Sequence, residues 1–111
     1  MDNNLIFEGQ FQELLWQIEN IEDSDSGAYY IFAPDGITRL DPDIEVAVAL
    51  LDTFGNDVTI TLSNGVQLEA VIDVITLQAI VRIYLENHPN ATSTELTHAA
   101  NYYLNNDAYI E

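Results

Sequence analysis

A shortage of basic side chains is the feature that most limits how this chain of 111 residues can fold. It carries 19 Asp and Glu against only Arg39 and Arg82, with no Lys, so the formal net charge is −17 at pH 7. Burying a charge is costly unless an opposite charge or hydrogen bonds compensate it. With so few cations available, we expect the carboxylates to remain on the surface, largely unneutralised.

This charge predicts the kind of partner the protein meets. A strongly negative surface repels nucleic acid and anionic membranes, and it attracts basic surfaces over a Debye length of about 8 Å at physiological salt. Solubility alone needs a net charge of magnitude about 2–8 in a small domain. Adaptation to high salt is the alternative, but such proteins use little Ile and Asn, whereas this chain has twelve and ten. We expect a basic nucleic-acid-binding protein as partner, with no direct binding to nucleic acid or membrane. The sequence does not determine the oligomeric state.

The apolar content is high enough for a folded core despite the charge. Hydrophobic residues make up 48% of the chain and Cys is absent, so neither disulfides nor thiolate metal sites are available. The length predicts one compact acidic domain over residues 1–111. The first residues lack a signal-peptide pattern, and no apolar run approaches 18 residues. We therefore expect a cytoplasmic protein, in the cytoplasm of the host cell if a phage encodes it.

The first half of the chain combines helical and strand patterns. Apolar residues at helical spacing predict a helix over residues 5–22. Strand formers at 28–32 precede a Pro-Asp-Gly turn at 34–36, so 37–40 is expected to return as the second strand of a hairpin. An Asp-Pro helix start and apolar spacing then predict a helix over residues 41–54.

The second half has clearer signals. Strands are predicted at 58–62 and 66–72, joined by a Ser-Asn-Gly turn at 63–65. Helices follow at 77–86 and 93–105, the second opened by a Thr-Ser-Thr-Glu capping box. The predicted fold class is α+β, a single domain with about four helices and two β-hairpins forming a small antiparallel sheet. The expected core comprises Phe11, Leu14, Ile18, Ile31, Leu51, Ile60, Leu62, Ile80, Val81, Tyr84, Leu96, Ala100 and Tyr103.

Motifs for other functions are weak. The last two predicted helices resemble a helix-turn-helix, but the second has no Lys or Arg to meet phosphates. The acidic loop at 23–27 departs from a calcium-binding loop at its fifth, sixth and twelfth positions. His88 and His98 are not at a spacing diagnostic of metal binding. Nucleophile elbows and phosphate-binding loops are absent. We expect no catalytic residues, no metal, no cofactor and no enzymatic activity.

Trp16 has two interpretations. On the predicted helix over 5–22 it lies about 180° from the apolar face, among Gln and Glu side chains. Because Trp is enriched at binding hot spots, it is a candidate interface anchor. The alternative is that the helix packs on two sides and that Trp16 belongs to the core.

Together these patterns favour a nucleic-acid mimic, a small acidic inhibitor of a nuclease, restriction enzyme or CRISPR effector, as phage anti-restriction and anti-CRISPR proteins are. The alternatives are an immunity protein or antitoxin that binds a basic toxin at an exosite, and a structural or adaptor protein that is acidic for solubility. The expected partner-binding residues are Glu13, Trp16, Glu19, Glu22, Asp23, Asp25, Asp41, Asp43 and Glu45.

Overall fold

The structure is a computed structural model, and it describes residues 5–22, 27–34, 36–37, 39–52, 59–61 and 65–106. Five strands are found in this part of the chain: β1 (Leu5–Gln10), β2 (Gly27–Pro34), β3 (Glu45–Asp52), β4 (Thr59–Thr61) and β5 (Gln67–Asp73). The helices found there are α1 (Phe11–Leu15), the short 3₁₀ helix η1 (Ile18–Asn20), α2 (Val74–Asn87) and α3 (Ser93–Asn106).

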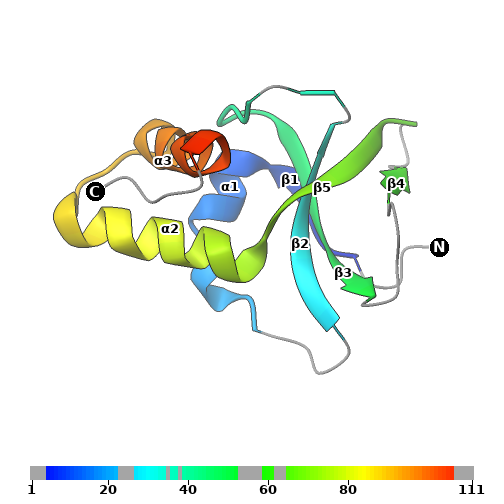
Figure 1. Cartoon of the computed structure of the whole chain (residues 1–111), viewed down its shortest axis with the longest axis horizontal. Helices are drawn as coiled ribbons and strands as arrows, with labels where there is room; N and C mark the ends of the chain where they lie inside the picture. Colours follow the sequence, from blue (N-terminus) through cyan, green and yellow to red (C-terminus); the bar gives the residue numbers. More distant parts are fainter. Residues whose placement is uncertain are drawn as a thin grey trace.

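The strands form one antiparallel sheet in the order β1-β3-β2-β5-β4. All three α-helices lie on one side of this twisted sheet (Figure 1). The main core fills the space between sheet and helices, with Ile31 and Val48 from the sheet meeting Phe11, Leu77 and Leu96 from the helices. The α+β class predicted from the sequence is confirmed, although three α-helices and η1 replace the predicted set of about four helices.

The sheet also buries apolar side chains on its other face. Phe32 of β2, Ala47 and Ala49 of β3, and Leu68 of β5 form a second, smaller cluster there. β2, the middle strand, and its neighbour β3 are each paired on both edges and carry buried side chains on both faces of the sheet.

The prediction of one helix over residues 5–22 is wrong, because only α1 and the short η1 within this range are helical. Residues 5–10 form β1, in which Ile6 and Glu8 are exposed while Phe7 packs against the main core. Pairing with β3 decides the outcome, because strand propensity depends on the neighbours that a segment finds in the fold. Gly9 permits the sharp change into α1, since a Cβ there would lie 3.1 Å from both Glu13 Oε1 and the Phe7 ring.

The prediction of a helix over residues 41–54 is also wrong. Asp41 and Pro42 form a turn, in which the amide of Ile44 donates to the Asp41 carbonyl at 3.1 Å, and the chain then enters β3. Val46 and Val48 point to the main core while Ala47 and Ala49 point to the other face. Helical spacing among the larger side chains concealed this alternation of period two.

The first predicted hairpin is partly wrong. Gly36 has a φ of +84°, and the amide of Ile37 donates to the Pro34 carbonyl at 3.4 Å, so a turn is present; Asp35 lies outside the described residues. However, the described residues of 37–40 are not a strand, and β2 pairs instead with β3 across a longer connection.

The second hairpin and the last two helices are confirmed. β4 pairs with β5, and Gly65 in the connection has a φ of +88°; Ser63 and Asn64 lie outside the described residues. Helix α2 begins earlier than predicted, because Asp73 caps it by accepting a hydrogen bond from the Thr76 amide at 3.1 Å. The capping box of α3 is formed as expected, with Thr92 and Glu95 bonding each other's amides at 3.0 and 3.2 Å.

Most of the predicted core is buried. Tyr103 is only partly buried and packs against the main core from α3, and the side chains of Leu51, Ile60 and Leu62 lie outside the described part. The remaining predicted residues are all buried: Phe11, Leu14, Ile18, Ile31, Ile80, Val81, Tyr84, Leu96 and Ala100.

A side-chain amide holds the connection between β2 and β3 onto α3. Asn101 accepts from the Leu40 amide and donates to the Leu40 carbonyl, each at 2.8 Å. Leu40 is buried, so without Asn101 both of its backbone groups would lose their partner in a place with little access to water.

Replacing Asn101 should therefore destabilise the domain. We expect Asn101→Ala to lower the free energy of unfolding by about 2 kcal/mol, because two backbone groups are left unsatisfied. The matched control is Asn105→Ala, an exposed position on the same helix, which should change it by no more than about 0.5 kcal/mol. Urea denaturation measures both variants, and equal stabilities would contradict this role of Asn101.

Candidate functional site

The predicted partner-binding residues lie mainly around α1, in two groups. Asp23 and Asp25 lie outside the described residues. Of the others, Glu13, Asp41, Asp43 and Glu45 lie near the start of α1, and we call them the strand-edge group. Glu19 and Glu22 follow the end of α1, and we call them the helix-side group.

Backbone contacts bring the strand-edge group together. The amides of Phe11 and Gln12 donate to the carbonyls of Ile44 and Pro42 at 2.9 and 2.8 Å, so the segment bearing Asp41 and Asp43 lies along the start of α1. Glu45 is paired with Gln10 at the end of β1.

Sequence reasoning missed one member of this surface. Glu8 is exposed on β1 opposite Ala47, and Gln10 is opposite Glu45. Glu8 and Glu45 are therefore diagonal neighbours on the same face of the sheet, about 7–8 Å apart in such a pairing. The helix predicted over residues 5–22 hid this relation, because it is created only by the pairing of β1 with β3. Glu8 therefore joins the strand-edge group.

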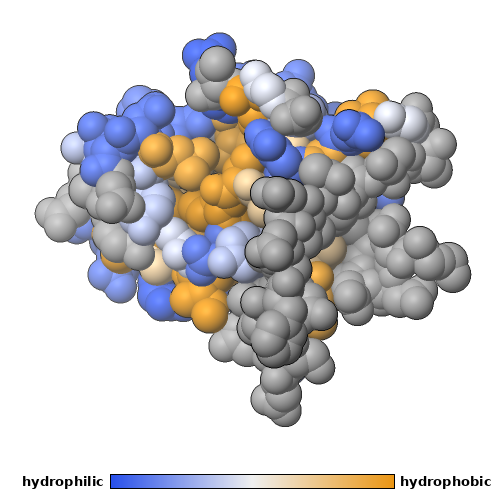
Figure 2. Space-filling view, turned by 45° about the vertical axis from the view of Figure 1, so that its right-hand side comes forward, coloured by the Kyte–Doolittle hydropathy of each residue, from blue (hydrophilic) through white to orange (hydrophobic). Residues whose placement is uncertain are grey.

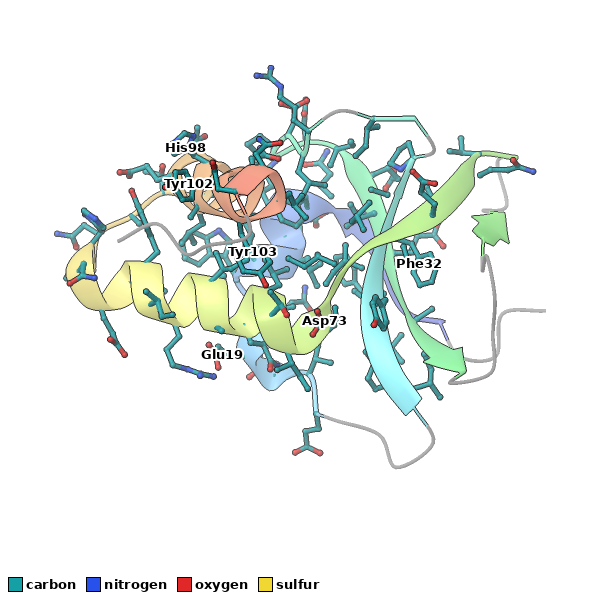
Figure 3. All side chains as sticks on the ribbon, in the orientation of Figure 1. Glu19, Phe32, Asp73, His98, Tyr102 and Tyr103 are labelled. Atoms are coloured by element: carbon teal, nitrogen blue, oxygen red, sulfur yellow. The ribbon has the colours of Figure 1, made fainter. Side chains whose placement is uncertain are left out.

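The helix-side group is fixed to α2. The Gln78 side-chain amide donates to the carbonyls of Ile18 and Ile21, both at 2.9 Å, and so ties η1 to that helix. Glu19 extends towards the outer side of α2 (Figure 3), where its carboxylate lies 3.4 Å from the Arg82 guanidinium.

Three of the predicted acids have partners within the protein. Glu13 accepts a hydrogen bond from the Gln10 amide at 2.9 Å. The Arg82–Glu19 pair and the Arg39–Asp41 pair, at 3.4 and 3.5 Å, are exposed to solvent, and such pairs contribute at most about 1 kcal/mol.

The remaining described acids of the two groups are free to meet a partner. Among the residues that the structure describes, Glu8, Glu22, Asp43 and Glu45 are exposed and make neither an ion pair nor a side-chain hydrogen bond. Both arginines of the chain are already engaged with predicted site residues, so neither compensates these four acids.

Trp16 belongs to the surface. It caps the end of α1 between the two groups and is 57% exposed, which rules out the core alternative. The sequence placed it correctly on the polar side of its helix, although that helix is much shorter than predicted. Its role as an interface anchor remains a prediction.

The histidines do not form a common site. His88 stacks on Tyr84 at the end of α2, with ring centroids 4.4 Å apart. His98 and Tyr102 are exposed on the outer side of α3, whereas Tyr103 is directed towards α2 (Figure 3). His98 lines a polar hollow of about 250 Å³ between α3 and the segment around Arg39 and Asp41.

In the part of the chain that the structure describes, no group of three or more His, Cys, Asp or Glu side chains is arranged to hold a metal ion. Within the same residues, no helix combines the length and the apolar character needed to cross a membrane.

No protein-family model, curated protein or solved structure matches this chain. The surface of the molecule is therefore the guide to what it binds.

The exposure of Trp16 predicts a small effect on stability when it is removed. We expect Trp16→Ala to change the free energy of unfolding by less than about 1 kcal/mol, because little apolar area leaves the core. Phe11→Ala, at a fully buried position in the same short helix, should cost about 3–5 kcal/mol. A loss for Trp16→Ala close to that of Phe11→Ala in urea denaturation would show that Trp16 packs into the core.

The unpaired carboxylates predict that salt stabilises the fold. Between low and moderate NaCl, the urea midpoint should rise because the ions screen repulsion among the acids. The double variant Asp43→Asn/Glu45→Gln should have a higher midpoint at low salt and a weaker dependence on NaCl. A flat or falling midpoint in the unmodified protein would show that the carboxylates repel each other too little to matter.

Proposed function

We propose that this protein is an inhibitor that occupies the nucleic-acid-binding site of a basic protein, acting as a nucleic-acid mimic. The observation that carries the proposal is the set of four exposed acids without an internal partner, Glu8, Glu22, Asp43 and Glu45, in a chain of net charge −17. Nucleases, restriction enzymes and CRISPR effectors are the class of target that such a surface fits.

Rigidity of the acidic segments supports mimicry. A cleft for nucleic acid recognises regularly spaced phosphates, and a mimic must hold its charges at fixed positions to compete with them. Glu8 and Glu45 are on paired strands, and Asp43 follows a segment anchored by Asn101 and by the start of α1. Glu22 follows η1, which Gln78 ties to α2. Little ordering of these segments is then needed on binding.

The helix pair α2 and α3 lacks the features of a helix-turn-helix that contacts nucleic acid directly. In a helix-turn-helix the second helix meets phosphates through basic side chains, but the exposed positions of α3 carry Glu95, His98 and Tyr102 and neither Lys nor Arg. This pair instead closes the main core, since Leu96 and Ala100 of α3 are buried. We propose that the protein does not bind DNA or RNA itself.

An immunity protein or antitoxin that binds a basic toxin at an exosite is the second candidate. The exposure of Trp16 between the two acidic groups favours it, because an apolar anchor ringed by charges is typical of contacts between folded proteins. Both candidates predict a basic partner, and they differ in whether that partner's nucleic-acid site is occupied.

Competition separates the two candidates. The partner is captured from host lysate on the immobilised protein at low salt, released at high salt and purified. If the protein is a mimic, DNA or RNA that the partner binds, when added first in excess, should block complex formation. Unchanged binding after saturation with nucleic acid would reject mimicry and favour the exosite mechanism.

Charge variants provide the matched control for that assay. Asp43→Asn/Glu45→Gln should weaken the complex and slow its association, because charges at the rim of an interface act mainly on the on-rate. Glu69→Gln/Glu86→Gln removes the same charge from β5 and α2 and should have a smaller effect. Equal effects of the two variants would mean that net charge, and not the strand-edge group, determines binding.

A further inference from the structure

Exposed apolar side chains of this protein have two kinds of surroundings. In the middle of the face shown in Figure 2, hydrophobic residues gather into one area. Trp16 has polar neighbours instead, with Gln12 and Glu13 before it and Gln17 after it. At 57% exposure it is also the most exposed large apolar side chain of the described residues. What binds to its ring therefore has to suit a polar, charged environment.

The indole ring of Trp16 lies beside the preceding turn of α1. Trp16 ends this helix with a φ of −79° and a ψ of −10°, so it continues the helical conformation. Side chains three and four residues apart on a helix are neighbours, with Cβ atoms about 5–6 Å apart, and a helical side chain leans towards the N-terminal turn. We therefore place the ring next to Gln12 and Glu13.

Two carboxylates belong to this part of the surface. Glu13 is exposed, and its Oε1 accepts a hydrogen bond from the Gln10 amide at 2.9 Å, which fixes the carboxylate and leaves Oε2 available. The Gln12 amide donates to the Pro42 carbonyl at 2.8 Å, so the exposed Asp43 follows directly on the segment that borders the turn. The indole ring therefore has two acids near it, each on a segment that hydrogen bonds hold in place.

The charges near the ring indicate what stacks on it. Both arginines of the chain are engaged with other carboxylates, Arg39 with Asp41 and Arg82 with Glu19, and the chain has no Lys. An aliphatic side chain on the ring would take carboxylates out of water without compensating them, which is costly. A second copy of the chain would bring another 17 net negative charges and would be repelled. A cation from a basic partner suits both the ring and the acids.

We propose that Trp16 is a stacking site for an arginine side chain of the partner, whose guanidinium lies on the indole face and donates to Glu13 or Asp43. The face of a Trp ring is the negative side of its quadrupole and attracts cations. A guanidinium is planar, so it can stack while its N–H groups meet a carboxylate, whereas an ammonium has no flat face. The site rests on the proposed function for its basic partner, but not on that partner's nucleic-acid site being occupied.

The test uses three peptides and the fluorescence of Trp16, the single Trp of the chain. The peptides are acetyl-Lys-Arg-Lys-amide and the same peptide with Lys or Leu at its centre. At low salt the Arg peptide should change the Trp16 emission and bind about threefold more tightly than the Lys peptide of equal charge, which is the size of an exposed cation–π contact. The Leu peptide should bind more weakly than both.

Substitutions show whether the ring and its acids are responsible, and calorimetry measures them because some lack the fluorescent residue. Trp16→Leu keeps an apolar side chain without a ring and should abolish the preference for Arg over Lys, whereas Trp16→Tyr should retain part of it. Asp43→Asn should weaken binding of the Arg peptide more than Glu86→Gln, which removes the same charge from α2. All three positions are exposed, so the variants should fold.

Four results would overturn the stacking site. They are equal binding of the Arg and Lys peptides, a Leu peptide that binds as tightly as the Arg peptide, a preference for Arg that survives in Trp16→Leu, and an emission change with rising protein concentration in the absence of peptide, which would indicate a second copy. The outcome is independent of the competition assay. A failed competition alongside a preference for Arg would reject mimicry and leave the stacking site in place, and a successful competition without that preference would do the reverse.

Discussion

Neutral side-chain amides, not ion pairs, hold the irregular parts of this protein onto its helices. Gln78 bonds the carbonyls of Ile18 and Ile21, and Asn101 bonds both backbone groups of Leu40, each across about sixty residues of sequence. A chain with two arginines, no lysine and 19 acids has few ion pairs to use for this purpose, and the two found among the described residues are exposed. Amides can fix a segment without consuming or neutralising a carboxylate.

These amide contacts explain how a surface rich in repelling charges stays ordered. Each bonded segment leads directly to exposed acids, Ile21 to Glu22 and Leu40 to Asp43. Repulsion among carboxylates favours an expanded chain, and it weakens only when salt or a basic partner screens it. The hydrogen bonds resist that expansion where the acids are presented. The domain therefore separates the groups that maintain the fold from those that remain available for binding.

The sequence predicted the parts of the fold whose signals are local. The Ser-Asn-Gly turn, the capping box at Thr92 and the apolar spacing of α2 each depend on neighbouring residues, and all are confirmed where the structure describes them. The two wrongly predicted helices fall on β1 and β3, where both periodicities fit the residues and only long-range pairing decides between them. The return strand predicted at 37–40 failed for the same reason, because β2 pairs with β3 instead. Residues 41–54 misled because Asp-Pro begins a turn as readily as a helix.

For the candidate site, too, local features were predictable and those created by long-range contacts were not. Exposure of Glu22, Asp43 and Glu45 was predictable, because a charge is visible in the sequence itself. For Trp16 the sequence left surface and core open, and the structure places it on the surface. The relation of Glu8 to Glu45 was not predictable, since the pairing of β1 with β3 creates it. The anchoring of Leu40 by Asn101 and the bulge at Val71 were not predictable either, because neither has a local sequence pattern.

The proposed surface combines two kinds of interaction with different consequences for binding. Exposed carboxylates accelerate encounter with a basic partner and lose their effect as salt rises, so they act chiefly on association. An apolar contact made by the exposed Trp16 would resist dissociation and depend little on salt. An inhibitor that used charge alone would be displaced from its target by the nucleic acid that it imitates, since both compete through the same electrostatic attraction. In the proposed function, an apolar contact at Trp16 is unavailable to a phosphate backbone, and it would give the inhibitor an advantage over nucleic acid at the same site.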